Sequence, residues 1–116
     1  MSDNKEMIKI IYDTLEDKFG EDIRIINIDS ISNICEYFVV VNGNSTTHVK
    51  SLAMNVEEKL KDAGYLPYNI EGIRGNSWIL MDYSNVVIHV FDKENRDFYN
   101  IERLWSDGID VNIKDM

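Results

Sequence analysis

The sequence has few of the residues that thiol chemistry requires. Cysteine occurs once among 116 residues, as Cys35. A single cysteine excludes an internal disulfide and a metal site built from several cysteines. Cys35 adjoins an apolar stretch, and the negative charge of the neighbouring Glu36 disfavours a thiolate. We therefore expect a partly buried structural thiol rather than a nucleophile.

Basic residues are also scarce. The chain has 12 Lys and Arg against 21 Asp and Glu, which gives a net charge of −9. Nonspecific nucleic-acid binding depends on clustered cations, so we expect no direct binding to DNA. An acidic surface is compatible with a basic protein partner, but charge alone does not identify one.

Long apolar segments are absent as well. No apolar run approaches the roughly 18 residues that indicate a membrane-spanning helix. The first nine residues, MSDNKEMIK, are polar and include two acids, unlike a signal peptide. We therefore expect no membrane association and a cytoplasmic location. The length predicts a single domain over residues 1–116.

Hydrophobic periodicity predicts the order helix, strand, strand, helix, three strands and helix. Helices are expected at residues 4–18 and 46–63, strands at 23–28, 36–41, 68–73, 77–83 and 86–91, and a last helix from Asp92 or Asn95. Ser45 is a suitable N-cap, and Gly20 and Gly64 are placed to end the two long helices. This order predicts an α+β fold with a mixed five-stranded sheet. Alternation of Ile109, Val111 and Ile113 suggests a further short strand in the tail.

The strand at residues 77–83 has two different faces. Trp78, Leu80 and Asp82 share one face, because alternate residues of a strand project to the same side. If helices cover the opposite face, which carries Ile79 and Met81, these three form an apolar strip edged by an acid. An exposed aromatic beside leucine is typical of a binding anchor. The alternative is that Trp78 belongs to the core.

Several ordered blocks resemble the ribosomal silencing factor (Iojap) family, over about residues 23–108. Their order and spacing carry the resemblance, because each block alone is a weak signal. The blocks are Glu36-Tyr37-Phe38-Val39-Val40, Gly43-Asn44-Ser45, Glu71-Gly72, Trp78, Asp82-Tyr83, Val86-Val87-Ile88-His89-Val90-Phe91, and then Arg96, Tyr99, Glu102, Leu104 and Trp105.

The resemblance implies a function and a set of contacts. It implies binding to ribosomal protein number fourteen of the large subunit, on the face that meets the small subunit. Subunit joining would be blocked and translation lowered when nutrients are short. It also implies a homodimer in the free state and a fold related to nucleotidyltransferases. With it we expect a partner to contact Trp78, Leu80, Asp82, Tyr83, Glu71 and His89, and a structural or dimer role for Arg96, Tyr99, Glu102 and Trp105.

A nucleotidyltransferase-like, nucleotide-binding enzyme is the alternative. Gly43-Asn44-Ser45 imitates the turn at a helix start that such enzymes use, but they also need paired acids on a following strand to hold Mg²⁺. The next acids, Glu57 and Glu58, fall on the polar face of a helix, and Asp82 stands alone on its strand. We therefore expect no enzymatic activity, no cofactor and no metal site.

The turn at residues 82–85 departs from the family pattern, and the role of His89 is left open by it. The family's Asp-Tyr-Gly-Asp turn is Asp82-Tyr83-Ser84-Asn85 here, and serine tolerates positive φ less well than glycine. We expect an altered turn with the same strand pairing, with Asn85 the better site for positive φ. His89 shares a strand face with Val87 and Phe91, which favours a packed, hydrogen-bonded histidine or an interface contact over a metal ligand.

Overall fold

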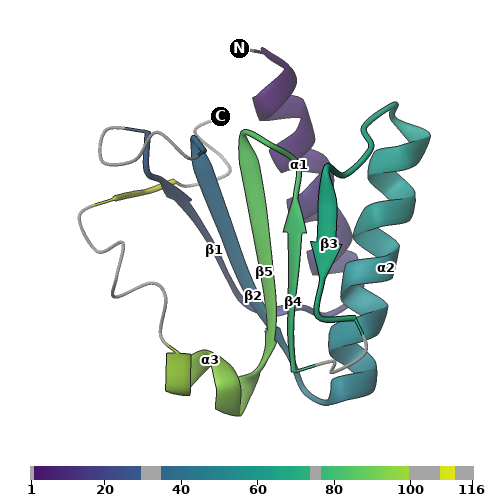
Figure 1. Ribbon diagram of the computed structural model, residues 1–116, viewed down its shortest axis with the longest axis vertical. Helices are drawn as coiled ribbons and strands as arrows, with labels where there is room; N and C mark the ends of the chain where they lie inside the picture. Colours follow the sequence, from purple (N-terminus) through teal and green to yellow (C-terminus); the bar gives the residue numbers. More distant parts are fainter. Residues whose placement is uncertain (1, 30–34, 74–76, 100–107, 112–116) are drawn as a thin grey trace.

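The structure, a computed structural model, describes residues 2–29, 35–73, 77–99 and 108–111. Its helices and strands follow the predicted order, with one short strand added in the tail (Figure 1). They are α1 (Ser2–Asp17), β1 (Glu21–Asn27), β2 (Tyr37–Gly43), α2 (Thr46–Asp62), β3 (Asn69–Glu71), β4 (Trp78–Asp82), β5 (Val86–Asp92), α3 (Lys93–Tyr99) and β6 (Ile109–Asp110).

The strands form one mixed sheet in the order β3-β4-β5-β2-β1-β6. β2 and β5 pair in parallel, and the other neighbours pair antiparallel. The predicted mixed sheet is confirmed, and β6 extends the five expected strands to six. β6 pairs with the end of β1, opposite Ile26 and Asn27, in the tail where the alternation suggested a strand.

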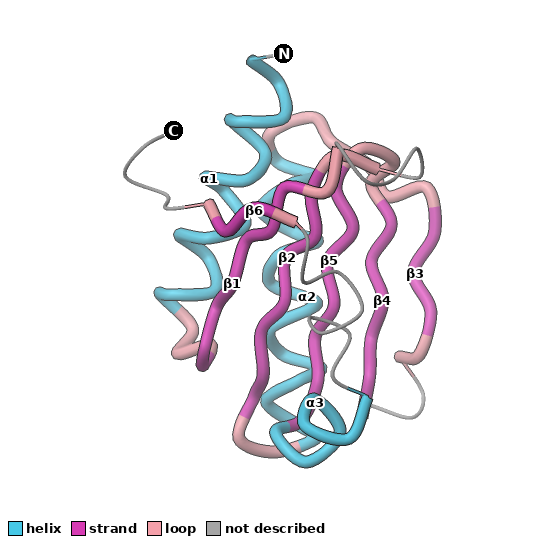
Figure 2. Tube along the Cα trace, turned by 90° about the vertical axis from the view of Figure 1, so that its left-hand side faces the viewer, coloured by secondary structure: helices cyan, strands magenta, loops and turns pink. Residues whose placement is uncertain are grey.

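Helices α1 and α2 lie side by side on one face of the sheet (Figure 2). Their apolar stripes are fully buried against side chains from the central strands, among them Ile79, Met81, Ile88 and Val90. α3 packs near the ends of β2 and β5 and lies on the other side of the sheet (Figure 2). None of the helices in the described part of the chain is long and apolar enough to cross a bilayer.

The two long helices end in different ways. Gly64 takes φ +95 after α2, as predicted for a left-handed cap. After α1 the left-handed residue is Phe19, with φ +65, and not Gly20. Gly20 instead donates its N–H to the carbonyl of Leu15 at 2.7 Å, and a Cβ at Gly20 would lie 2.8 Å from a methyl of Val41. Glycine is therefore needed there for close packing rather than for its φ.

Candidate functional site

The faces of β4 divide as its alternation predicted. Ile79 and Met81 are fully buried under the helices. Trp78, Leu80 and Asp82 are half-buried on the opposite face, so the condition for an accessible strip is met. We call these three residues the β4 strip. Glu71, on the neighbouring edge strand β3, pairs with Leu80 and is exposed, which adds a second carboxylate beside the strip.

The indole of Trp78 is held by two aromatic neighbours on β5. It stacks on Phe91 with ring centroids 5.0 Å apart, and its Nε1–H donates to Nδ1 of His89 at 3.2 Å. The ring of His89 meets Phe38 of β2 edge-on, with centroids 4.9 Å apart. An aromatic fixed in this way loses little conformational entropy when a partner binds, which suits an anchor.

His89 lies beneath the strip rather than on it. Its side chain is 5% exposed, which confirms the expected packed, hydrogen-bonded histidine. Because the indole nitrogen can only donate, Nδ1 accepts and the ring proton sits on Nε2. Burial lowers the pKa of His89 from 6.5 to about 4. The ring is therefore neutral at physiological pH and positions Trp78.

Tyr83 does not belong to the accessible strip. It is 5% exposed and packs in the core on the helix side of the sheet. Burial, followed by the charge of Glu57, raises the pKa of its hydroxyl to about 12. The expectation that Tyr83 contacts a partner is therefore corrected, because the alternation that exposes Asp82 turns the next side chain inward.

The turn after β4 uses positive φ at Ser84. Ser84 has φ +74, and the N–H of Asn85 donates to the carbonyl of Tyr83 at 3.0 Å, which closes a three-residue turn. Oδ1 of Asp82 accepts the N–H of Ser84 at 2.8 Å. The strand pairing is as predicted, but the preference for Asn85 was wrong: the carboxylate of Asp82 fixes Ser84 instead.

Replacing Ser84 by glycine should stabilise the fold. A non-glycine residue at positive φ costs on the order of 1–3 kcal/mol, and the substitution removes this cost. Glycine itself lowers the stability by about 0.5–1 kcal/mol, because its unfolded chain has more conformational entropy. We expect Ser84→Gly to raise the free energy of unfolding by about 1 kcal/mol in urea titrations. Asn85→Gly, whose φ is not positive, is the matched control and should not stabilise the protein.

Cys35 is buried near the same turn. Its side chain is 5% exposed, and burial together with the charge of Asp82 raises the pKa of the thiol to about 11. A thiol with so high a pKa is a weak nucleophile at neutral pH. The expected structural role of Cys35 fits this environment.

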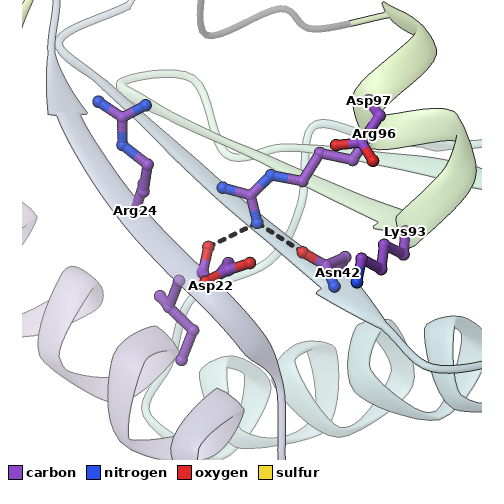
Figure 3. Close-up of a pocket in the computed structure, with 7 residues that line it drawn as sticks. Asp22, Arg24, Asn42, Lys93, Arg96 and Asp97 are labelled. Carbon is purple, nitrogen blue, oxygen red and sulfur yellow. Dashed lines mark hydrogen bonds between the residues drawn. The ribbon is translucent and has the colours of Figure 1, made fainter.

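A polar pocket of about 460 Å³ lies near the ends of β2 and β5 (Figure 3). Arg96 of α3 reaches into it from a largely buried position. Its Nη1 donates to the carbonyl of Asp22 at 2.6 Å and to Oδ1 of Asn42 at 2.7 Å. Asp22 has φ +50 and lies where the register between β1 and β2 shifts, so the bulge turns its carbonyl to this guanidinium.

Arg96 thus ties α3 to the sheet, one of the two roles expected for it. These two hydrogen bonds run to a backbone carbonyl and to a side-chain amide. The side chain of Tyr99, and Glu102 and Trp105 altogether, lie outside the described residues, so their expected roles stay predictions.

The turn Gly43-Asn44-Ser45, which resembles the turn of nucleotidyltransferases, forms the start of helix α2. Ser45 caps α2, since its Oγ accepts the N–H of His48 at 3.1 Å. A Cβ at Gly43 would lie 2.9 Å from the backbone nitrogen of Val49, so glycine allows the helix to start against the strand. Glu57 and Glu58 lie on α2. Within the described ranges, no three His, Cys, Asp or Glu side chains gather closely enough to hold a metal ion.

Two features of the site were missed by sequence reasoning. The bulge at Asp22 gives no signal in the pattern of apolar residues, and the arginine that its carbonyl meets stands 74 positions away in the chain. Tyr68 lies beside Asp82 and is 83% exposed, although the strand expected at residues 68–73 places it within the sheet. The single proline, Pro67, directly before it was the available signal that the chain leaves regular structure there.

Comparison with known proteins connects the whole chain to one family. The family model described as "Ribosomal silencing factor during starvation" matches residues 1–116. Ribosomal silencing factor RsfS of Bacillus subtilis is 35% identical over 104 residues, which cover 90% of this chain and 88% of that protein. The mouse protein named "Mitochondrial assembly of ribosomal large subunit protein 1" is 28% identical over 85% of this chain and 45% of its own length.

Solved structures show the same fold. A protein from Chromobacterium violaceum superposes with a TM-score of 0.85 at 37% identity, over 87% of this chain and 84% of that one. A protein from Bacillus halodurans superposes with a TM-score of 0.82 at 30% identity, over 92% and 97% of the two chains. Sequence and structure thus agree, and the chain belongs to the ribosomal silencing factor family.

Proposed function

We propose that the protein binds the large ribosomal subunit through ribosomal protein number fourteen and thereby keeps the small subunit from joining. In this proposal it acts in the cytoplasm, as a non-enzymatic repressor of translation when nutrients are short. Membership of a family named for ribosome silencing supports a ribosome-associated role. The name of the mouse relative, which refers to the large subunit, supports the choice of subunit.

The observation that carries the docking part of the proposal is the β4 strip. It offers a fixed indole, a leucine and a carboxylate on a face that α1 and α2 leave uncovered. Interfaces are anchored by such aromatic residues, while neighbouring charges select the partner and speed the encounter. Asp82 and the exposed Glu71 complement a basic surface, and the net charge of −9 acts in the same direction at longer range.

The non-enzymatic part rests on where the acids lie. Phosphoryl transfer needs carboxylates that converge on Mg²⁺. Glu57 and Glu58 are on a helix and Asp82 bonds to its own turn. Calorimetric titration with Mg²⁺ and nucleoside triphosphates should therefore give no heat of binding. Micromolar binding would favour the nucleotide-binding alternative.

The proposal is tested by subunit joining. Purified large and small subunits are mixed at a Mg²⁺ concentration that supports association, with and without the protein, and separated on sucrose gradients. We expect the protein to sediment with free large subunits and to reduce the peak of joined ribosomes. An unchanged joined peak at saturating protein would overturn the blocking role. The homodimer that the family resemblance implies is tested separately, by sedimentation equilibrium of the free protein.

A further inference from the structure

Tyr68 is the most exposed large hydrophobic side chain that the structure describes. It is 83% exposed, and Leu66 of the same loop is 71% exposed. The loop joins α2 to β3 and lies at the same end of the sheet as the turn between β4 and β5 (Figure 1). The β4 strip ends at this turn, with Asp82, so Tyr68 continues the strip beyond the sheet.

The loop that carries Tyr68 is fastened at both ends. The N–H of Tyr65 donates to the carbonyl of Leu60 at 2.8 Å, and its hydroxyl donates to Glu6 of α1 at 2.8 Å. At the other end, the N–H of Tyr68 donates to the carbonyl of Asp82 at 2.7 Å. An aromatic ring held out on a fastened loop is preorganised for contact, so little entropy is lost when a partner binds it.

A hollow of about 150 Å³ separates Tyr68 from the turn. It is lined by Tyr68, Asp82, Ser84 and Val87, which we call the Tyr68 socket. Val87 is 7% exposed and forms an apolar floor. Asp82 uses Oδ1 to hold Ser84, and its carboxylate has further acceptor positions for a second donor. The socket therefore combines an aromatic ring, an apolar floor and a carboxylate.

These three surfaces match the parts of one long cationic side chain. The methylene stem of Lys or Arg packs on apolar surface, its charged end pairs with a carboxylate, and the face of an aromatic ring attracts the cation. Asp82 and the net charge of −9 disfavour an anionic occupant such as an RNA phosphate. The occupant that fits is a side chain of a basic protein.

We propose that the Tyr68 socket receives a single lysine or arginine side chain of the ribosomal protein that the β4 strip contacts. This inference rests on the proposed function, since the same partner must occupy the strip. The indole of Trp78 supplies apolar contact at one end of the surface. The socket, at the other end, fixes the position of the partner along it. Tyr68 is thus a specificity-determining residue.

Binding of variants to isolated large subunits tests this assignment. We expect Tyr68→Ala to weaken binding about tenfold and Tyr68→Phe to bind within about twofold of the unchanged protein, because the ring and not the hydroxyl faces the cation. Phe19→Ala is the matched control: Phe19 is 80% exposed and belongs to the turn after α1, and its loss should leave the affinity unchanged.

A double variant tests whether Tyr68 and Asp82 share one cation. Tyr68→Ala combined with Asp82→Asn should lose less affinity than the product of the two single losses, since either change already releases the same side chain. A loss equal to the product overturns the shared cation, as does a Tyr68→Phe variant that binds as weakly as Tyr68→Ala.

If Tyr68→Ala binds normally while Trp78→Ala does not, the socket is wrong and the proposed docking function stands. If the unchanged protein does not bind at all, the docking function itself fails.

Discussion

Trp78→Ala is expected to weaken binding to the large subunit by roughly 30-fold or more, equivalent to about 2 kcal/mol. The reason is that Trp78 is the largest side chain of the β4 strip and is held in one orientation by Phe91 and His89. Truncation removes the anchor and leaves a hollow beside His89. Equilibrium binding to purified large subunits, by sedimentation or by fluorescence of a labelled protein, measures the loss.

A charge variant tests the same surface without removing its packing. Asp82→Lys should weaken binding at least tenfold, because it places a cation against a basic partner. Asp82→Asn keeps an acceptor for the N–H of Ser84 and should give a smaller loss. Met54→Ala is the control, since Met54 is 51% exposed on α2, which packs on the other face of the sheet. Normal affinity in both Trp78→Ala and Asp82→Lys, with thermal unfolding unchanged, would show that the strip is not the docking surface.

Acidification is expected to destabilise the protein through His89. The pKa of this histidine is lowered from 6.5 to about 4 by burial, so the unfolded chain binds a proton more readily than the folded one. The neutral ring's contribution is fully present above pH 6.5 and is lost as the pH falls toward 4. At about 1.36 kcal/mol per pKa unit, the whole loss is about 3 kcal/mol.

Comparison with His89→Phe isolates this contribution from that of the carboxylates. Phenylalanine keeps a ring against Phe38 and Phe91 but does not titrate. Urea unfolding at pH 7 and pH 4.5 should show a larger fall in the free energy of unfolding for the unchanged protein than for the variant, by about 2 kcal/mol. Equal falls would mean that His89 does not titrate as its burial requires. Because the folded protein keeps this ring neutral until the pH approaches 4, affinity for the large subunit should fall only near and below that pH, where a protonated Nδ1 can no longer accept the indole N–H of Trp78.

The features that could be predicted from the sequence depend on local periodicity. The alternation along β4 separated Trp78 and Leu80 from Ile79 and Met81, and the helical stripes gave α1 and α2. Which face of β4 is open depends on where the helices pack. From the sequence, the open face could be named only on the condition that helices cover the other one, and the structure shows which face they cover.

The features that could not be predicted depend on contacts between distant segments. For His89 the sequence left a packed side chain and a partner contact as alternatives. Its place between Phe38 and Trp78 follows from the pairing of β5 with β2 and β4. Ser84 takes positive φ because Asp82 binds its N–H, although asparagine stands next to it. Local propensity favoured Asn85 for positive φ, and the hydrogen bond from Ser84 to Asp82 outweighed it.

The most direct test of the account is a photo-crosslink from the β4 strip. A benzophenone amino acid at Leu80, at the centre of the strip, is activated after the protein has bound isolated large subunits, and the attached ribosomal protein is identified by mass spectrometry. The same group at Met54 on α2 serves as the control. We expect the group at Leu80 to attach to ribosomal protein number fourteen and the group at Met54 not to. Attachment of Leu80 to another ribosomal protein, or of Met54 alone to protein fourteen, would contradict it.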